Sequence, residues 1–166
     1  MKILIFGFKP YFGYKENITE KVVSRLKKRK NLHKIVWPVK FDRKVFREAI
    51  EKYKPDVILG LGQHPKAHKI RIERRAVNLK RIDEKRKPTE IEKKNPRYRL
   101  VNLKLTSDRN ARVVYDAGDY ACNFCMYIIS GIAQSKNIKF AFLHIPKDYN
   151  IRKAVKFVES KINTIS

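Results

Sequence analysis

Cysteine is scarce in this chain, with only Cys122 and Cys125 among its 166 residues. The two lie three residues apart on a predicted helix, where a mutual disulfide is poorly placed, and one Cys-x-x-Cys without a second pair is a weak zinc signal. His64 and His68 stand four apart, but Pro65 between them argues against a shared helix face and favours a surface loop. The sequence therefore predicts no disulfide framework and no metal site, and a reducing, cytoplasmic location is the simplest interpretation.

Long apolar runs and Pro/Gly/Ser-rich tracts are missing as well. The longest apolar runs fall far short of the ~20 residues that a membrane-spanning helix needs, so no membrane association is expected. The apolar segment from Met1 to Phe6 is too short before Gly7 to be the core of a signal peptide and is predicted to be a strand. With 43% hydrophobic residues and no linker-like tract, the chain is predicted to form a single domain over residues 1–166.

Acidic residues are also few. The chain has 16 Asp and Glu against 40 Lys and Arg, a formal net charge of +24. A positive balance of this size is typical of nucleic-acid-binding proteins, so nucleic acid is a candidate partner from charge alone. No helix-turn-helix, zinc-finger or RNP-type aromatic motif accompanies it. A solvated surface of a heat-adapted protein is the alternative explanation, and like charge of this size opposes self-association.

Strand and helix patterns alternate along most of the chain. Apolar runs predict strands at 2–6, 35–39, 57–61, 111–115 and 140–144, and apolar residues at helical spacing predict helices at about 18–26, 42–53, 119–130 and 151–162. The strand at 57–61 is apolar on both sides, which is typical of a central parallel strand covered by helices. This order predicts an α/β fold, a three-layer αβα sandwich with a mostly parallel central sheet and right-handed crossovers.

Residues 64–113 interrupt this pattern. They hold 17 Lys and Arg against 6 Asp and Glu, with few aromatics. A segment of this composition buries little surface by itself, so we expect a basic surface excursion, or a subunit-contact arm, at about 64–110.

Three short segments supply the side chains of a cysteine hydrolase. Cys122 falls in the first turn of its predicted helix, where unpaired N–H groups and the helix dipole favour a thiolate. His144 ends a buried strand, at the edge where parallel sheets place their ligands, and Glu73 comes soon after the end of another. Nucleophile, base and orienting carboxylate make up the triad of acyl transfer. The alternative is structural: a buried cysteine, a core histidine, and a Glu73 paired with Arg71 or Arg74.

The sequences around these three residues form longer motifs. In chain order they are Gly-Phe-Lys-Pro-Tyr-Phe-Gly from Gly7 with Asn17 beyond it, Gly62-Gln63, Glu-Arg-x-Ala-x-Asn from Glu73, Ala-Gly-x-Tyr-x-Cys-Asn ending at Asn123, and Phe-Leu-His-Ile-Pro from Phe142. Together they resemble the pyroglutamyl peptidase I family, also called pyrrolidone carboxyl peptidases, over nearly the whole chain. The cysteine and histidine motifs are the most specific part of the resemblance.

The resemblance implies a thiol peptidase that removes N-terminal pyroglutamate from peptides without cofactor or metal. Cys122 is then the nucleophile, His144 the general base and acid, and Glu73 the residue that holds the imidazole. The implied substrate-binding residues are the ring walls Phe8 and Tyr11, together with Asn17, Gln63 and Ile82. A two-residue shortening aligns Arg81 with the arginine by which the family stabilises the oxyanion. The resemblance also implies a homo-oligomer.

The chain departs from the family pattern near the expected pocket. The family's glycine-rich loop after Gln63 is replaced by His64-Pro65-Lys66, which is stiffer and bulkier. Phe12 stands where the family has a glycine, and it could fill the ring pocket. Backbone approach to the substrate is therefore expected to be restricted.

Two further departures concern the nucleophile. Asp119 places a negative charge near Cys122, which disfavours a thiolate there. Relative to the family, a segment that usually carries a helix is missing between the glutamate and the cysteine. The alternative function is therefore a catalytically impaired paralogue that binds nucleic acid or another acidic partner through its basic surface.

Overall fold

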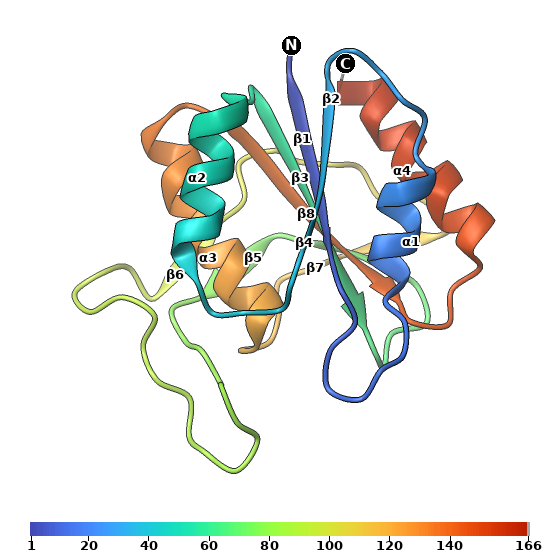
Figure 1. Ribbon diagram of the computed structural model, residues 1–166. Coiled ribbons are helices and arrows are strands. Elements are labelled where there is room, and N and C mark those ends of the chain that lie inside the picture. The colour runs from blue at the N-terminus through green and yellow to red at the C-terminus, as the bar shows by residue number, and fades with distance from the viewer. Residues whose placement is uncertain (166) are drawn as a thin grey trace.

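A six-stranded sheet forms the middle of the molecule in the computed structural model, which describes residues 1–165 (Figure 1). The strand order is β2-β1-β3-β8-β4-β7. These strands are β1 (Ile3–Phe8), β2 (Leu32–Trp37), β3 (Val57–His64), β4 (Ile70–Glu73), β7 (Ala111–Val114) and β8 (Lys139–Pro146). Neighbouring strands run parallel except β4 and β8, which are antiparallel. The mostly parallel sheet that the sequence predicts is confirmed.

Helices cover both faces of this sheet and complete the three layers. Figure 1 shows α2 (Arg43–Tyr53) and α3 (Ala121–Ser135) on one face, and α1 (Ile18–Arg25) and α4 (Ile151–Ile165) on the other. Each face has its own cluster of buried apolar side chains. The predicted αβα sandwich is therefore confirmed.

Short polar residues define where two of these helices begin. The side chain of Asn17 accepts a hydrogen bond from the Thr19 N–H at 3.0 Å, and that of Asp42 accepts one from the Lys44 N–H at 2.8 Å. Each satisfies one of the N–H groups that a helix start leaves unpaired. Helix α2 ends at Lys54, whose left-handed backbone (φ 45°) turns the chain toward β3.

The two central strands, β3 and β8, bring the site residues to one edge. They pair in register from Val57 opposite Lys139 to His64 opposite Pro146. Both are buried along almost their whole length, because helices cover each face. Full burial of each large apolar side chain contributes about 1.5–3 kcal/mol, which makes this pair a rigid platform. The strands end together, so the residues around Gly62 and His144 lie side by side.

The expected surface excursion at about 64–110 lies on the surface only in part. Residue His64 ends β3, and β4 pairs with β8 and β7 inside the main sheet. The rest contains an antiparallel ribbon of β5 (Arg75–Val77) and β6 (Tyr98–Leu100). The loop between these two strands extends away from the body of the molecule (Figure 1). Pattern analysis missed β4 because it is short and charged side chains alternate with its apolar ones.

Asn78 closes the base of this loop. Its side-chain oxygen accepts hydrogen bonds from the N–H groups of Ile91 and Glu92 at 3.0 and 2.9 Å, and its amide donates to the Glu92 carbonyl at 2.7 Å. Lys80 and Thr89 exchange backbone hydrogen bonds farther out. The base of the loop is thus ordered by these internal bonds together with the burial of Ile91 in the core.

Two absences hold for the part of the chain that the structure describes. None of its helices is both long and apolar enough to cross a membrane. It also contains no group of three or more His, Cys, Asp or Glu side chains placed to hold a metal ion.

Candidate active site

Three elements carry Glu73, Cys122 and His144 to one place. His144 lies on β8, with Gly62 of β3 opposite it on one side and Arg71 of β4 on the other. Glu73 is the last residue of β4, and Cys122 is the second residue of α3. The structure therefore brings together all three side chains that the sequence suggested as a triad.

His144 and Glu73 are joined by a buried hydrogen bond. Nδ1 of His144 lies 2.9 Å from Oε1 of Glu73, and neither side chain is more than 5% exposed. Burial alone lowers the pKa of His144, but the charge and hydrogen bond of Cys122, followed by those of Glu73, raise it to about 9. The imidazole is therefore suited to hold a proton next to a thiolate.

Cys122 lies against the backbone of β3. A Cβ placed on Gly62 would stand 2.7 Å from the Cys122 Sγ and 2.9 Å from Cδ2 of His144, so only glycine leaves room for both. Tyr120 precedes the helix without a side-chain cap, so the first-turn N–H groups stay available to an anion. Cys125, one turn farther along, is completely buried, and burial, followed by the charge of Cys122, raises the pKa of its thiol.

Asn123 anchors the helix that carries Cys122. Its side-chain oxygen accepts from the Val77 N–H at 2.9 Å, and its amide donates to the carbonyls of Val77 and Leu79 at 2.8 and 2.7 Å. The side chain is fully buried. The sequence contained Asn123 in a motif but did not reveal this role, because its partners are backbone groups 44 and 46 residues away.

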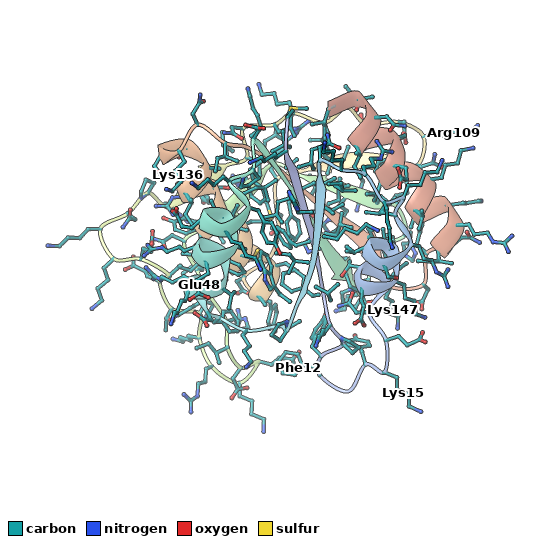
Figure 2. The ribbon with its side chains drawn as sticks, turned by 45° about the horizontal axis from the view of Figure 1, so that its top comes forward. Phe12, Lys15, Glu48, Arg109, Lys136 and Lys147 are labelled. Carbon is teal, nitrogen blue, oxygen red and sulfur yellow. The ribbon has the colours of Figure 1, made fainter. Side chains whose placement is uncertain are left out.

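The end of β1 and the loop after it carry aromatic residues, of which Tyr11 interacts with Cys122. Phe8 is buried at the end of β1. Tyr11 is half-buried, and burial, with the charges of Cys122 and Tyr14, raises its pKa to about 12, so its hydroxyl keeps its proton. Phe12 is 77% exposed, and Figure 2 shows it at the margin of the molecule. The expectation that Phe12 could fill the pocket is thus not met by its position.

Two buried amides lie where this loop returns to the sheet. Asn17 donates from its amide to the Lys9 carbonyl at 3.2 Å and so holds the loop that carries Tyr11. Gln63 accepts from the Ile18 N–H at 3.0 Å, while its Nε2 is buried and has no hydrogen-bond partner within residues 1–165. A buried amide donor without a partner is costly, which marks Nε2 as a group available to a ligand.

Arg81 lies at the start of α3. Its Nε and Nη2 bind the Asp119 carboxylate in a fork, with the shortest contact at 2.8 Å, and its Nη1 donates to the Arg86 carbonyl at 3.0 Å. The Asp119 charge that the sequence analysis set against the thiolate is therefore paired. Ile82 is 59% exposed and forms no closed wall by itself.

Arg71 and His64 adjoin Glu73 and His144 from outside. Arg71 donates from Nε to Oε1 of Glu73 at 2.7 Å, which confirms one of the two ion pairs considered for that glutamate. The rings of His64 and His144 lie edge to face, with centroids 5.3 Å apart. Pro65 predicted a surface loop at His64, whereas the structure places His64 as the last residue of β3. The predicted strand at 57–61 ends three residues too early, and a strand continued to residue 64 would have placed His64 beside the other site residues.

Comparison with known proteins gives one consistent result. The pyroglutamyl peptidase family matches residues 1–157 of this chain. Pyrrolidone-carboxylate peptidase from Saccharolobus islandicus strain L.S.2.15 is 30% identical over 88% of this chain and 79% of its own length. The corresponding protein from Lactobacillus johnsonii is 31% identical over 88% of this chain and 78% of its own.

Solved structures share the fold. Pyrrolidone carboxyl peptidase from Thermococcus litoralis superposes with a TM-score of 0.85 at 22% identity, covering 98% of this chain and 91% of that one. Pyroglutamyl peptidase I from Bacillus amyloliquefaciens gives 0.82 at 25% identity, with 95% and 91% covered. The sheet and the helices therefore follow an arrangement already known from solved structures.

Proposed function

This chain belongs to the pyroglutamyl peptidase family, and from that premise we propose that it removes N-terminal pyroglutamate from peptides by cysteine chemistry. Family membership supports a peptidase. The observation that carries the cysteine mechanism is the buried Glu73–His144 hydrogen bond beside Cys122. The two free cysteines fit a reducing, cytoplasmic location.

In the proposed reaction, the Cys122 thiolate attacks the carbonyl carbon that links the lactam residue to the rest of the peptide. The new C–S bond pushes charge onto the carbonyl oxygen, and the first-turn N–H groups of α3 are suitable donors to it. His144 then gives its proton to the leaving amine, and the C–N bond breaks. His144 next takes a proton from water, which attacks the thioester and releases pyroglutamate and the thiolate. Glu73 keeps the imidazole oriented throughout.

Substrate recognition is proposed to use the aromatic loop and the buried amides. Phe8 and Tyr11 offer flat apolar walls to a five-membered ring. The unpartnered Nε2 of Gln63 offers a donor for the lactam carbonyl, and Asn17 contributes by holding the loop. Ile82 is proposed to line the outer side of the ring.

Arg81 is proposed to assist the oxyanion. Its guanidinium is held at the start of α3 by Asp119. Because Asp119 offsets its charge, Arg81 is proposed to act as a hydrogen-bond donor, through a guanidinium N–H that these contacts leave free.

Hydrolysis of pyroglutamyl-aminomethylcoumarin by freshly reduced protein tests this function. We expect fluorophore release that is lost in Cys122→Ser and kept in Cys125→Ala, which removes the other thiol. Prolyl-aminomethylcoumarin, whose ring lacks the lactam carbonyl, should not be cleaved. Absence of release from the pyroglutamyl substrate, in protein shown to be folded by circular dichroism, would reject the proposal.

Binding of an acidic polymer is the second candidate function, and one surface favours it. Tyr98 is 40% exposed on β6, and the guanidinium groups of Arg75 and Arg97 lie 4.5 and 5.2 Å from its ring centre. Tyr115, 55% exposed, is tied to the same place because Arg75 donates to its carbonyl at 2.9 Å. Exposed aromatics among cations are the elements of single-stranded nucleic-acid binding.

Salt dependence distinguishes this second candidate. Affinity for a fluorescent single-stranded oligonucleotide should fall steeply between about 50 and about 200 mM salt, because phosphate contacts release counterions. Tyr98→Ala should weaken binding, and Cys122→Ser should not. Binding that is absent, or insensitive to both salt and Tyr98, would remove this candidate and leave the peptidase proposal untouched.

A further inference from the structure

We propose that Arg71 and His64 form a positioning pair that sets the pH range over which Cys122 and His144 act together. This inference rests on the proposed peptidase function of the same site. It adds two residues that the triad itself does not include.

Arg71 is held at every nitrogen of its guanidinium. Nε donates to Oε1 of Glu73 at 2.7 Å, Nη1 points at Nε2 of His64 at 3.0 Å, and Nη2 donates to the Asp116 carbonyl. Its side chain is 13% exposed. A planar fork with three fixed partners has little freedom to move, so its charge stands at a defined place beside the triad.

The guanidinium and the catalytic imidazole share one oxygen. Oε1 of Glu73 accepts from Arg71 at 2.7 Å and lies 2.9 Å from Nδ1 of His144. The other oxygen, Oε2, is buried without a hydrogen-bond partner among residues 1–165. The positive charge of Arg71 therefore offsets part of the pull of the carboxylate on a protonated His144. If the Arg71 charge is removed, His144 remains as the cationic partner of the Glu73 oxygen, and the carboxylate stabilises the protonated imidazole more strongly.

His64 supplies the neutral support for Arg71. Its Nε2 lies 3.0 Å from Nη1 of Arg71, and its Nδ1 lies 3.2 Å from the Lys66 nitrogen. A neutral imidazole accepts a hydrogen bond at only one of its nitrogens, and the tautomer protonated at Nδ1 accepts from Arg71 at Nε2. Burial, followed by the charges of His144 and Arg71, lowers the pKa of His64 to about 4. A neutral His64 can accept from Arg71 and adds no charge against His144, on whose ring it packs.

The other charged and titratable groups around this pair come from three elements. Cys122 on α3 acts directly on His144, and Tyr11 on the loop after β1 interacts with Cys122. Arg112 on β7 lies opposite Arg71 in register, and its charge acts on His64. Arg71 differs from all of these because it hydrogen-bonds the oxygen that holds His144.

Titration of the His144 imidazole by nitrogen-15 NMR tests the pair without requiring peptide hydrolysis. In Arg71→Gln we expect His144 to release its proton about one pH unit higher, and the alkaline limb of kcat/KM to move with it. His64→Ala should shift the His144 titration and the alkaline limb in the same direction, but by less. His64→Gln should leave both at their wild-type values, because its side-chain carbonyl can still accept from Arg71. The double variant Arg71→Gln, His64→Ala should shift no farther than Arg71→Gln, because His64 acts through Arg71. Arg109→Gln, in an exposed turn, removes the same charge as a control.

Each outcome decides between positioning and mere structural support. An unshifted or lowered His144 titration in folded Arg71→Gln overturns the proposal, even when activity falls. If Arg71→Gln does not fold, the contrast between His64→Ala and His64→Gln decides, and equal titrations in the two reject it. A wild-type protein that shows no hydrolysis rejects the proposed function, while the NMR titration still reports on the pair.

Discussion

The substitution Gly62→Ala measures how closely the nucleophile and the base are set against β3. The new Cβ would lie 2.7 Å from the Cys122 Sγ and 2.9 Å from both His144 Cδ2 and Phe142 Cζ. Apolar atoms prefer separations of about 3.5–4.0 Å, so Sγ and the imidazole must each move by roughly 1 Å. A misplacement of about 1 Å in an active site costs about 100-fold in rate, or about 2.7 kcal/mol of transition-state stabilisation. Overpacking should add about 1–3 kcal/mol of destabilisation.

The assay is kcat/KM on the pyroglutamyl-coumarin substrate, normalised to the folded fraction from thermal unfolding. Gly60→Ala is the matched control on the same strand. Its Cβ would meet the rings of Phe142 and Phe6 at 2.4 and 2.5 Å but would have neither Cys122 nor His144 among its nearest neighbours. It should lose at least as much stability as Gly62→Ala and far less activity per folded molecule. Wild-type kcat/KM in folded Gly62→Ala would refute the reasoning.

The remaining predictions concern the triad, the helix anchor and the oxyanion. Glu73→Gln should lower kcat by about 100-fold or more. It should also move the alkaline limb of the pH–rate profile below about pH 9, because Glu73 is among the groups that raise the pKa of His144. An unmoved limb would contradict this reasoning. Asn123→Ala should lower the free energy of unfolding by about 2–4 kcal/mol, because it leaves the backbone groups of Val77 and Leu79 unpaired. In the same thermal scan the control Asn95→Ala, at an exposed position, should change stability very little. Arg81→Gln should lower kcat by about 10-fold to 100-fold with little change in KM, whereas a change confined to KM would point to ground-state binding instead.

The core strands and the convergence of Glu73, Cys122 and His144 could be predicted because their signals are local. Segments 57–61 and 140–144 are short and apolar on both sides, which is typical of a covered parallel strand. Cys122 at a helix start and His144 at a strand end follow from the same element assignments. Their convergence follows from the common edge at which parallel strands end.

The supporting contacts could not be predicted, because they join residues far apart in sequence. Arg71 pairs with a neighbour on its own strand, which a local pattern suggests, but its contact with the carbonyl of Asp116 needs the β4–β7 pairing. The bonds of Asn123 to β5 and the Arg81–Asp119 fork are of the same kind. Such contacts depend on short strands with mixed side chains, whose periodicity is too brief to detect.

The two thiols one turn apart on α3 give this protein a built-in pair of chemical reporters. Cys122 is partly exposed, whereas Cys125 is wholly buried and burial holds its pKa well above the usual range. A brief dose of an alkylating reagent should therefore modify one sulfur per native molecule, and a second only in molecules that have opened. Counting labels by mass spectrometry would then give the native fraction of a sample directly. The activity of an unlabelled portion of the sample, divided by this native fraction, would separate a misfolded preparation from an inactive enzyme.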